Sequence, residues 1–169
     1  MPTPVLAVDF RTEQTAMPAT FSGSRPPVDG SSPEHPKVNI LLVDDTPDNL
    51  VALEAVLTEL GQNLIKAHSG EEALRLLLRQ EFAVILLDVN MPGLNGFETA
   101  QMIRQRKSTE HIPIIFVSAI STSDTHLFKG YALGAVDYIF TPVIPDVLRS
   151  KVSVFVELLK KTEETLLNM

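Results

Sequence analysis

Five short apolar runs alternate with segments of helical spacing over most of the chain. The runs are rich in Val, Ile and Leu and show no strict polar and apolar alternation, which is typical of strands buried on both faces of a sheet. They occupy residues 38–43, 64–68, 83–87, 113–117 and 136–140. The pattern therefore predicts an α/β protein with five strands.

Helical spacing of apolar positions follows each of these runs. The predicted helices cover residues 47–60, 70–79, 96–106 and 123–133, and a last helix begins near Pro145. Thr46 and Asn95 stand at N-cap positions, and Ser69 with Glu72 matches the sequence of a capping box. Five successive βα units predict a doubly wound, five-stranded parallel sheet with helices on both faces.

Carboxylates and a hydroxyl follow three of the predicted strands. Asp44 and Asp45 come directly after the first run and Asp88 after the third, while Ser118 follows the fourth. Sites in such sheets gather at the carboxyl ends of the strands, near the switch in strand order. Three neighbouring carboxylates raise one another's pKa values, and a divalent cation removes this conflict. Oxygen ligands favour Mg²⁺ over zinc, and a carboxylate beside Mg²⁺ is a candidate nucleophile toward a phosphoryl group.

Each of these acids also has a purely structural explanation. Adjacent acids before a helix complement the helix dipole, and an Asp after a strand often forms a turn. The combination of acids after two strands with a serine after another is more specific than any one of these residues. The functional interpretation therefore rests on the combination.

Composition separates the first 37 residues from the rest. Residues 1–37 hold seven of the twelve prolines and many Ser and Thr, which is typical of a disordered tail or linker. The net charge of −7 argues against a nucleic-acid or membrane surface, and the lack of cysteine excludes disulfides and thiolate metal sites. No apolar stretch approaches the roughly 20 residues of a membrane span. The N-terminus lacks a signal-peptide pattern, so we expect a cytoplasmic protein.

Four segments together resemble the receiver domain of two-component response regulators, the CheY-like family. They read "ILLVDD", "LLDVNMPGLNGFE", "IPIIFVSA" and "ALGAVDYIFTP". The resemblance covers residues 38–160 and implies the (βα)5 flavodoxin-like receiver fold. It also implies that Asp88 accepts a phosphoryl group from a histidine kinase, a histidine phosphotransfer protein or a small phosphodonor.

The resemblance assigns a metal site around the phosphoacceptor. It implies that Asp45 and Asp88 bind Mg²⁺ through their side chains and that the backbone carbonyl of Asn90 is a third ligand. Asp44 would then act through a water molecule. All four residues follow the first or third predicted strand.

The resemblance also assigns a switch. It implies that Ser118 donates to a phosphoryl oxygen and that Tyr138 is the switch aromatic, which turns inward when Ser118 moves. Phosphorylation would then reshape the face made by the helix at 123–133, the last strand and the last helix. A residue pair of this kind is a two-state element, as a switch requires.

The sequence departs from the family pattern at Thr141, where the family has a lysine that reaches the phosphoryl group. Losing that charge-assisted hydrogen bond is expected to weaken stabilisation of the phosphorylated state by about 1.5–3 kcal/mol. Lys66 and Lys107 lie in segments that we expect elsewhere in the fold. Three interpretations stay open: a working receiver with altered activation, a degenerate receiver that binds partners or dimerises without phosphate, and an introduced substitution.

The last helix is longer than a receiver requires. Leu148, Val152, Phe155, Leu159 and Leu166 follow heptad-like spacing, with Thr162 at the missing position. The first half is expected to pack on the core. Residues 161–169 extend the helix, and they form either a frayed end or a parallel coiled coil that creates a homodimer or leads into another domain.

No output domain is visible in the sequence, so we expect a signalling domain and not an enzyme beyond its own phosphorylation and dephosphorylation. An aspartyl-nucleophile hydrolase is disfavoured. Such enzymes usually carry a second acid two residues after the nucleophile, where this chain has Asn90.

Overall fold

The computed structural model describes residues 36–119, 131–132, 134–135 and 137–167. By its internal contacts the chain divides into two units, Met1–Pro36 and Lys37–Met169. Residues 1–35 of the predicted N-terminal tail lie outside the described residues, as does most of the helix predicted at 123–133. Every element below belongs to the second unit.

Five parallel strands form one sheet, as the apolar runs predict, and their order is β3-β2-β4-β5-β6. Their bounds are β2 (Asn39–Val43), β3 (Asn63–Ala67), β4 (Val84–Asp88), β5 (Ile114–Ala119) and β6 (Asp137–Thr141). The first strand, β2, has β3 on one side and β4 on the other, so the strand order reverses there. The carboxyl ends of β2 and β4 meet beside this reversal, which is where an open α/β sheet places its site.

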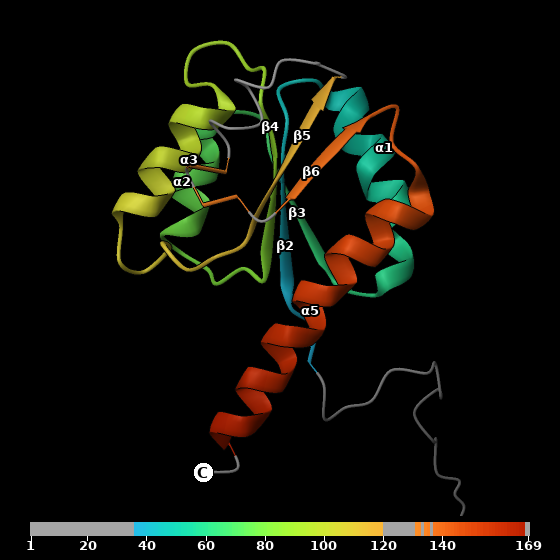
Figure 1. Cartoon of the computed structure of the whole chain (residues 1–169), viewed down its shortest axis with the longest axis vertical. Helices are drawn as coiled ribbons and strands as arrows, with labels where there is room; N and C mark the ends of the chain where they lie inside the picture. The colour runs from blue at the N-terminus through green and yellow to red at the C-terminus, as the bar shows by residue number, and fades with distance from the viewer. Residues whose placement is uncertain (1–35, 120–130, 133, 136, 168–169) are drawn as a thin grey trace, which may run out of the picture. The chain divides into compact units, whose positions relative to one another are not determined.

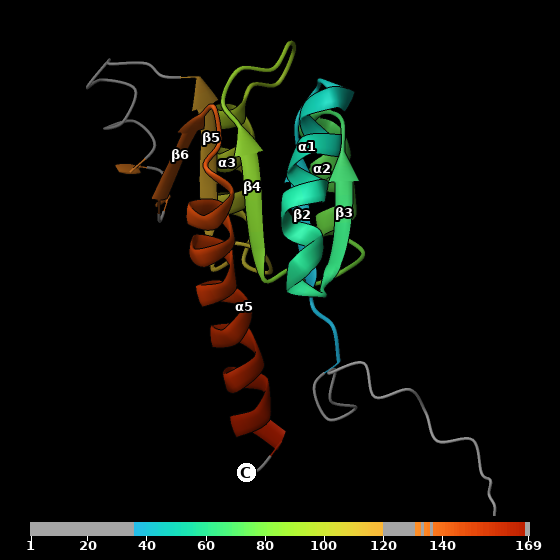
Figure 2. The same cartoon turned by 90° about the vertical axis from the view of Figure 1, so that its right-hand side faces the viewer.

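Helices cover both faces of the sheet (Figures 1 and 2). They are α1 (Pro47–Leu57), its 3₁₀ continuation η1 (Thr58–Leu60), α2 (Gly70–Leu77), α3 (Gly96–Gln105) and α5 (Pro145–Leu167). Helices α2 and α3 pack on one face, and α1 and α5 pack on the other. Alternate residues of β2 enter opposite cores: Leu41 joins the α2 and α3 side, whereas Leu42 joins the α1 and α5 side.

The predicted helix starts differ in how their caps form. Asn95 and Glu98 make a complete capping box, with each side chain accepting from the backbone amide of the other residue. The box predicted at Ser69 is only half correct. Ser69 accepts from the Glu72 amide at 3.0 Å, but the Glu72 carboxylate accepts from the His68 amide at 2.7 Å. Thr46 occupies its N-cap position without a side-chain cap bond.

Helix α5 divides into a buried half and an exposed half. Leu148 and Val152 are fully buried in the core, whereas Leu166 is 64% exposed. The helix continues without a break to Leu167, and Figure 2 shows it running past the edge of the sheet. The first half of the heptad-like seam is therefore core packing, and the coiled coil stays a prediction for the second half.

Candidate functional site

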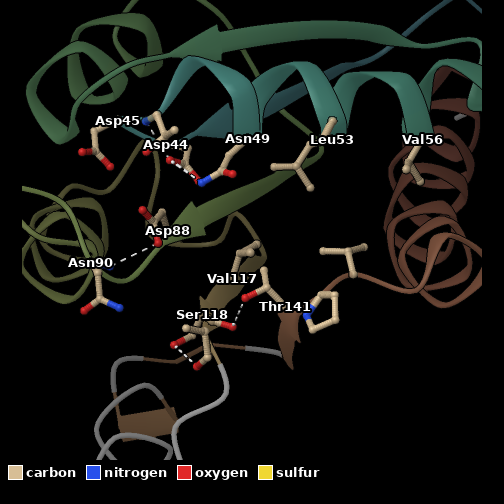
Figure 3. Close-up of a pocket in the computed structure, with 15 residues that line it drawn as sticks. Asp44, Asp45, Asn49, Leu53, Val56, Asp88, Asn90, Val117, Ser118 and Thr141 are labelled. Atoms are coloured by element: carbon tan, nitrogen blue, oxygen red, sulfur yellow. Dashed lines mark hydrogen bonds between the residues drawn. The ribbon is translucent and has the colours of Figure 1, made fainter.

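Three carboxylates meet at the carboxyl edge of the sheet. Asp44 and Asp45 follow β2, and Asp88 is the last residue of its neighbour β4. One carboxylate oxygen from each residue lies within 4.8 Å of the others (Figure 3). The parallel register produces this arrangement, because it brings the ends of adjacent strands to the same edge.

Asp44 is the most firmly held of the three acids. Its side chain is 3% exposed and accepts from the Thr46 amide at 2.9 Å and from Asn49 Nδ2 at 3.2 Å. Burial raises the pKa of Asp44, the hydrogen bonds from Thr46 and Asn49 lower it, and the charge of Asp45 raises it further. Because neutral donors fix its oxygens, Asp44 is positioned before any cation binds.

Asp88 is a partly buried acid whose pKa is raised by burial and by the neighbouring carboxylates. Its pKa is raised to about 7, first by burial and then by the charge of Asp44; the Asn90 amide, which donates at 3.2 Å, opposes this rise. Ionising Asp88 near neutral pH therefore adds a third negative charge beside the buried Asp44 and its neighbour Asp45. A hard divalent cation removes that cost, so this oxygen donor set fits Mg²⁺.

Gly96 sets how closely α3 approaches the acid edge. A Cβ atom at this position would lie 2.2 Å from the carbonyl oxygen of Asp88 and 2.7 Å from Val89 Cα. The first turn of α3 can therefore abut the backbone at Asp88 only with glycine here. Sequence reasoning missed Gly96 as well as Asn49; the only available signals were their places in "LNGFE" and "DDTPDN".

The opposite wall of the site carries hydroxyls. Ser118 lies within β5, one residue before the strand ends at Ala119, and is 3% exposed. Its Oγ donates to the Ala119 carbonyl at 3.0 Å. Thr141 ends the neighbouring strand β6, and its Oγ1 makes only a long bond of 3.4 Å to the Ser118 carbonyl. This wall therefore offers polar groups but no charge.

A cleft of about 580 Å³ joins the two walls. Six of the predicted site residues line it together: Asp44, Asp45, Asp88, Asn90, Ser118 and Thr141. Beyond Thr141 the cleft continues between α1 and the loop that follows β6, with Leu53, Val56 and Val143 as apolar walls. Tyr138 is not among the described residues of the lining.

No described residue of the cleft lining is Lys, Arg or His. Lys66 pairs with Glu54 at 3.0 Å on β3 and α1, and Lys107 follows α3; neither lines the cleft. At the apolar end, Arg149 donates to the Val56 carbonyl at 3.3 Å and pairs with Glu59. Within the described lining, the positive charge lost at Thr141 is therefore not supplied by another side chain.

Tyr138 lies inside the domain beside β5. Its side chain is 5% exposed, and the register places it directly opposite Phe116. The two ring centroids are 5.5 Å apart. The switch position that the sequence predicts is thus filled by a ring that is turned inward.

Comparisons with known proteins agree with this fold. Residues 40–153 match the family model described as the response regulator receiver domain. The chain belongs to this family. Receiver domains bind Mg²⁺ at an acidic pocket and are phosphorylated by histidine kinases or phosphotransfer proteins, and they serve in signalling and are generally not enzymes.

Similar proteins differ in how much of their length the chain spans. It is 37% identical over 129 residues to a probable cyclic di-GMP phosphodiesterase of Vibrio cholerae, covering 76% of this chain but only 29% of that protein. It is 35% identical over 109 residues to the protein PilH of Pseudomonas aeruginosa, covering 64% of this chain and 89% of PilH. The chain thus spans less than a third of the phosphodiesterase but most of PilH.

Solved structures show the same fold. The chemotaxis response regulator CheY4 of Vibrio cholerae, crystallised at pH 4.0, has a TM-score of 0.66 and 28% identity, covering 70% of this chain and 98% of CheY4. A putative response regulator from Chloroflexus aurantiacus has a TM-score of 0.66 and 30% identity, covering 72% of this chain and 98% of the other.

Among the residues that the structure describes, no helix has the length and hydropathy of a membrane span.

Proposed function

We propose that this receiver domain accepts a phosphoryl group on Asp88 in a Mg²⁺-dependent reaction. The observation that carries the proposal is the cleft that holds Asp88, two further acids and Ser118 together. An Asp88 carboxylate oxygen attacks the phosphorus of a phosphohistidine or of acetyl phosphate. An acyl phosphate forms, the bond from phosphorus to imidazole nitrogen or acetate oxygen breaks, and imidazole or acetate leaves.

The other residues of the cleft position the reactants. Asp45, Asp88 and the carbonyl of Asn90 would hold Mg²⁺, and Asp44 would act through a water molecule. Bound Mg²⁺ supplies positive charge that neutralises the transferring phosphoryl oxygens. Ser118 would leave its bond to the Ala119 carbonyl and donate to a phosphoryl oxygen. Thr141 adds no charge, so we expect a less stable phosphorylated state than a lysine at this position would give.

The test is intact-mass spectrometry after incubation with acetyl phosphate, with and without Mg²⁺. We expect a gain of one phosphoryl group only with Mg²⁺, and no gain in Asp88→Asn. Asp48→Asn is the matched control, because Asp48 is an exposed acid in the first turn of α1 outside the cleft lining. Labelling of Asp88→Asn equal to the wild type would contradict the proposal.

The output face and the partners are part of the same proposal. A histidine kinase or a histidine phosphotransfer protein supplies the phosphoryl group, and the change is passed to the face that includes β6 and α5. Self-association through α5 would use the exposed second half of the predicted seam, where Leu166 is 64% exposed. Sedimentation velocity of the wild type and of Leu166→Glu tests the homodimer: we expect a dimer for the wild type and a monomer for the variant, and a monomeric wild type would contradict the homodimer.

A further inference from the structure

Four other aromatic rings connect Tyr138 to the core and to the surface. Phe116 is fully buried on one side of Tyr138 and in turn packs edge-on against Phe97, with centroids 5.0 Å apart. On the outer side, Tyr131 meets Tyr138 in a T-shaped contact at 5.5 Å. Phe140 stacks on Tyr138 at 5.8 Å with an interplanar angle of 8°. Tyr138 is therefore the central ring of a continuous aromatic cluster.

The position of Phe140 links this cluster to the cleft. The register of β5 and β6 pairs Phe116 with Tyr138 and Ser118 with Phe140. Residues two apart in a strand share a face, so Phe140 lies beside both Tyr138 and Ser118. Phe140 is 38% exposed, whereas Tyr138 is 5% exposed, so the phenylalanine is the more solvent-accessible ring of this stacked pair.

We propose that Phe140 is a positioning residue that holds the Tyr138 ring inward in the absence of a phosphoryl group. An outward turn of Tyr138 would break its contacts with both Phe116 and Phe140 and expose a large apolar ring. Loss of one aromatic pair shifts such an inward–outward equilibrium by about twofold to twelvefold. The stacked Phe140 therefore favours the inward state before any phosphorylation.

This inference deepens the proposed function by naming a bias in its switch. The consequence for signalling rests on the proposed function: Phe140 would bias the face that includes β6 toward its phosphorylated arrangement before a phosphoryl group reaches Asp88. The resting position of the Tyr138 ring does not depend on phosphorylation. The two parts can therefore be tested separately.

The test uses the full chain labelled with 3-fluorotyrosine. The sequence contains two tyrosines, so the ¹⁹F spectrum reports Tyr138 and, as an internal reference, Tyr131, which is 53% exposed. The measured quantity is the shift of each resonance between H₂O and D₂O, which reports solvent contact. Without a phosphodonor we expect the Tyr138 shift to be a small fraction of the Tyr131 shift.

Substitutions at Phe140 separate a positioning role from general packing. Phe140→Ala should raise the solvent shift of Tyr138 toward that of Tyr131, Phe140→Leu should have an intermediate effect, and Phe140→Trp should restore the wild-type value. Phe155→Leu is the matched control, because Phe155 packs on the core of the opposite sheet face. It should leave the Tyr138 resonance unchanged.

Two results would overturn the inference. One is a Tyr138 shift as large as that of Tyr131 in the fluorotyrosine-labelled wild type without phosphodonor. The other is a Tyr138 shift that Phe140→Ala and Phe140→Leu do not change. Intact mass after acetyl phosphate is recorded on the same samples. A chain that gains no phosphoryl group contradicts the proposed function, while the resting spectra still decide the role of Phe140.

Discussion

The two walls of the cleft differ in the polar and charged groups that they carry. On the β2 and β4 side, three carboxylates lie within reach of one ion, and Asp44 is already fixed by Thr46 and Asn49. On the β5 and β6 side, Ser118 and Thr141 offer hydroxyls, and no described lining residue is cationic. The proposed Mg²⁺ site therefore depends on one wall, whereas the proposed stabilisation of a phosphoryl group also needs the other.

The largest effect is expected on the acid wall. Losing a hydrogen-bond partner of a metal ligand weakens metal affinity by roughly 10- to 100-fold. Asp45→Asn removes a charged ligand itself, so it should weaken Mg²⁺ binding by more than this. Isothermal titration calorimetry measures this, with Asp48→Asn as the control. Equal affinity in the wild type and Asp45→Asn would show that the three acids do not form the Mg²⁺ site.

The next effect concerns the hydroxyl wall. Thr141→Lys should stabilise the phosphorylated state by about 1.5–3 kcal/mol, since a tethered ammonium can donate to a phosphoryl oxygen. The fraction phosphorylated at a fixed acetyl phosphate concentration is read by intact mass, and Mg²⁺ affinity is measured alongside. The account requires the phosphorylated fraction to rise; an unchanged fraction would mean that Thr141 is not what limits the switch.

A pH effect of intermediate size follows from Asp88. Its pKa is about 7 in the folded protein, above the 3.8 of an unperturbed aspartate, so the folded state binds the proton more tightly than the unfolded state. The free energy of unfolding of the metal-free protein should therefore fall through this group as pH rises from about 4 to about 7. Asp88→Asn removes this loss and should stabilise the protein by on the order of 2 kcal/mol above pH 7, with little effect near pH 4.

Urea denaturation of the wild type and Asp88→Asn in EDTA at several pH values measures this difference. Saturating Mg²⁺ should reduce it, because the cation stabilises the ionised carboxylate. A difference in unfolding free energy between the wild type and Asp88→Asn that is independent of pH would contradict the raised pKa of Asp88.

The smallest effect is expected from removing the Thr141 hydroxyl. Thr141→Val keeps the side-chain shape and loses a single long hydrogen bond of 3.4 Å, so the free energy of unfolding should change by less than about 0.5 kcal/mol. Phosphorylation should also change little. A loss of phosphorylation in Thr141→Val would show that the hydroxyl itself serves the reaction and would break the contrast between the walls.

The sheet and the acid edge could be predicted from sequence because both follow from local patterns. Buried parallel strands are continuous apolar runs, and residues directly after Val43 and Leu87 must come to one edge once β2 and β4 are neighbours. Asn49, Gly96 and Phe140 could not be found in this way. Their roles depend on which residue lies across a turn, a helix start or a strand pair, and these contacts leave no periodic signal.

One sequence-based prediction was half wrong and another was ambiguous, and both outcomes have clear physical causes. Glu72 could accept from either the Ser69 or the His68 amide, and the folded loop selects His68. The seam that runs from Leu148 to Leu166 has a spacing that fits both a coiled coil and a helix packed on a core, because 3.5 and 3.6 residues per turn differ little over two heptads. Burial of Leu148 and Val152 decides the first half for the core.

The most direct test of the central claim is to locate the phosphoryl group by chemical trapping. After incubation with acetyl phosphate and Mg²⁺, borohydride reduces an aspartyl phosphate to homoserine, and peptide mass spectrometry finds the changed residue. The account predicts homoserine at position 88, lost when Mg²⁺ is removed. Homoserine at 44 or 45 with Asp88 unchanged would contradict the assignment of Asp88 as the phosphoacceptor.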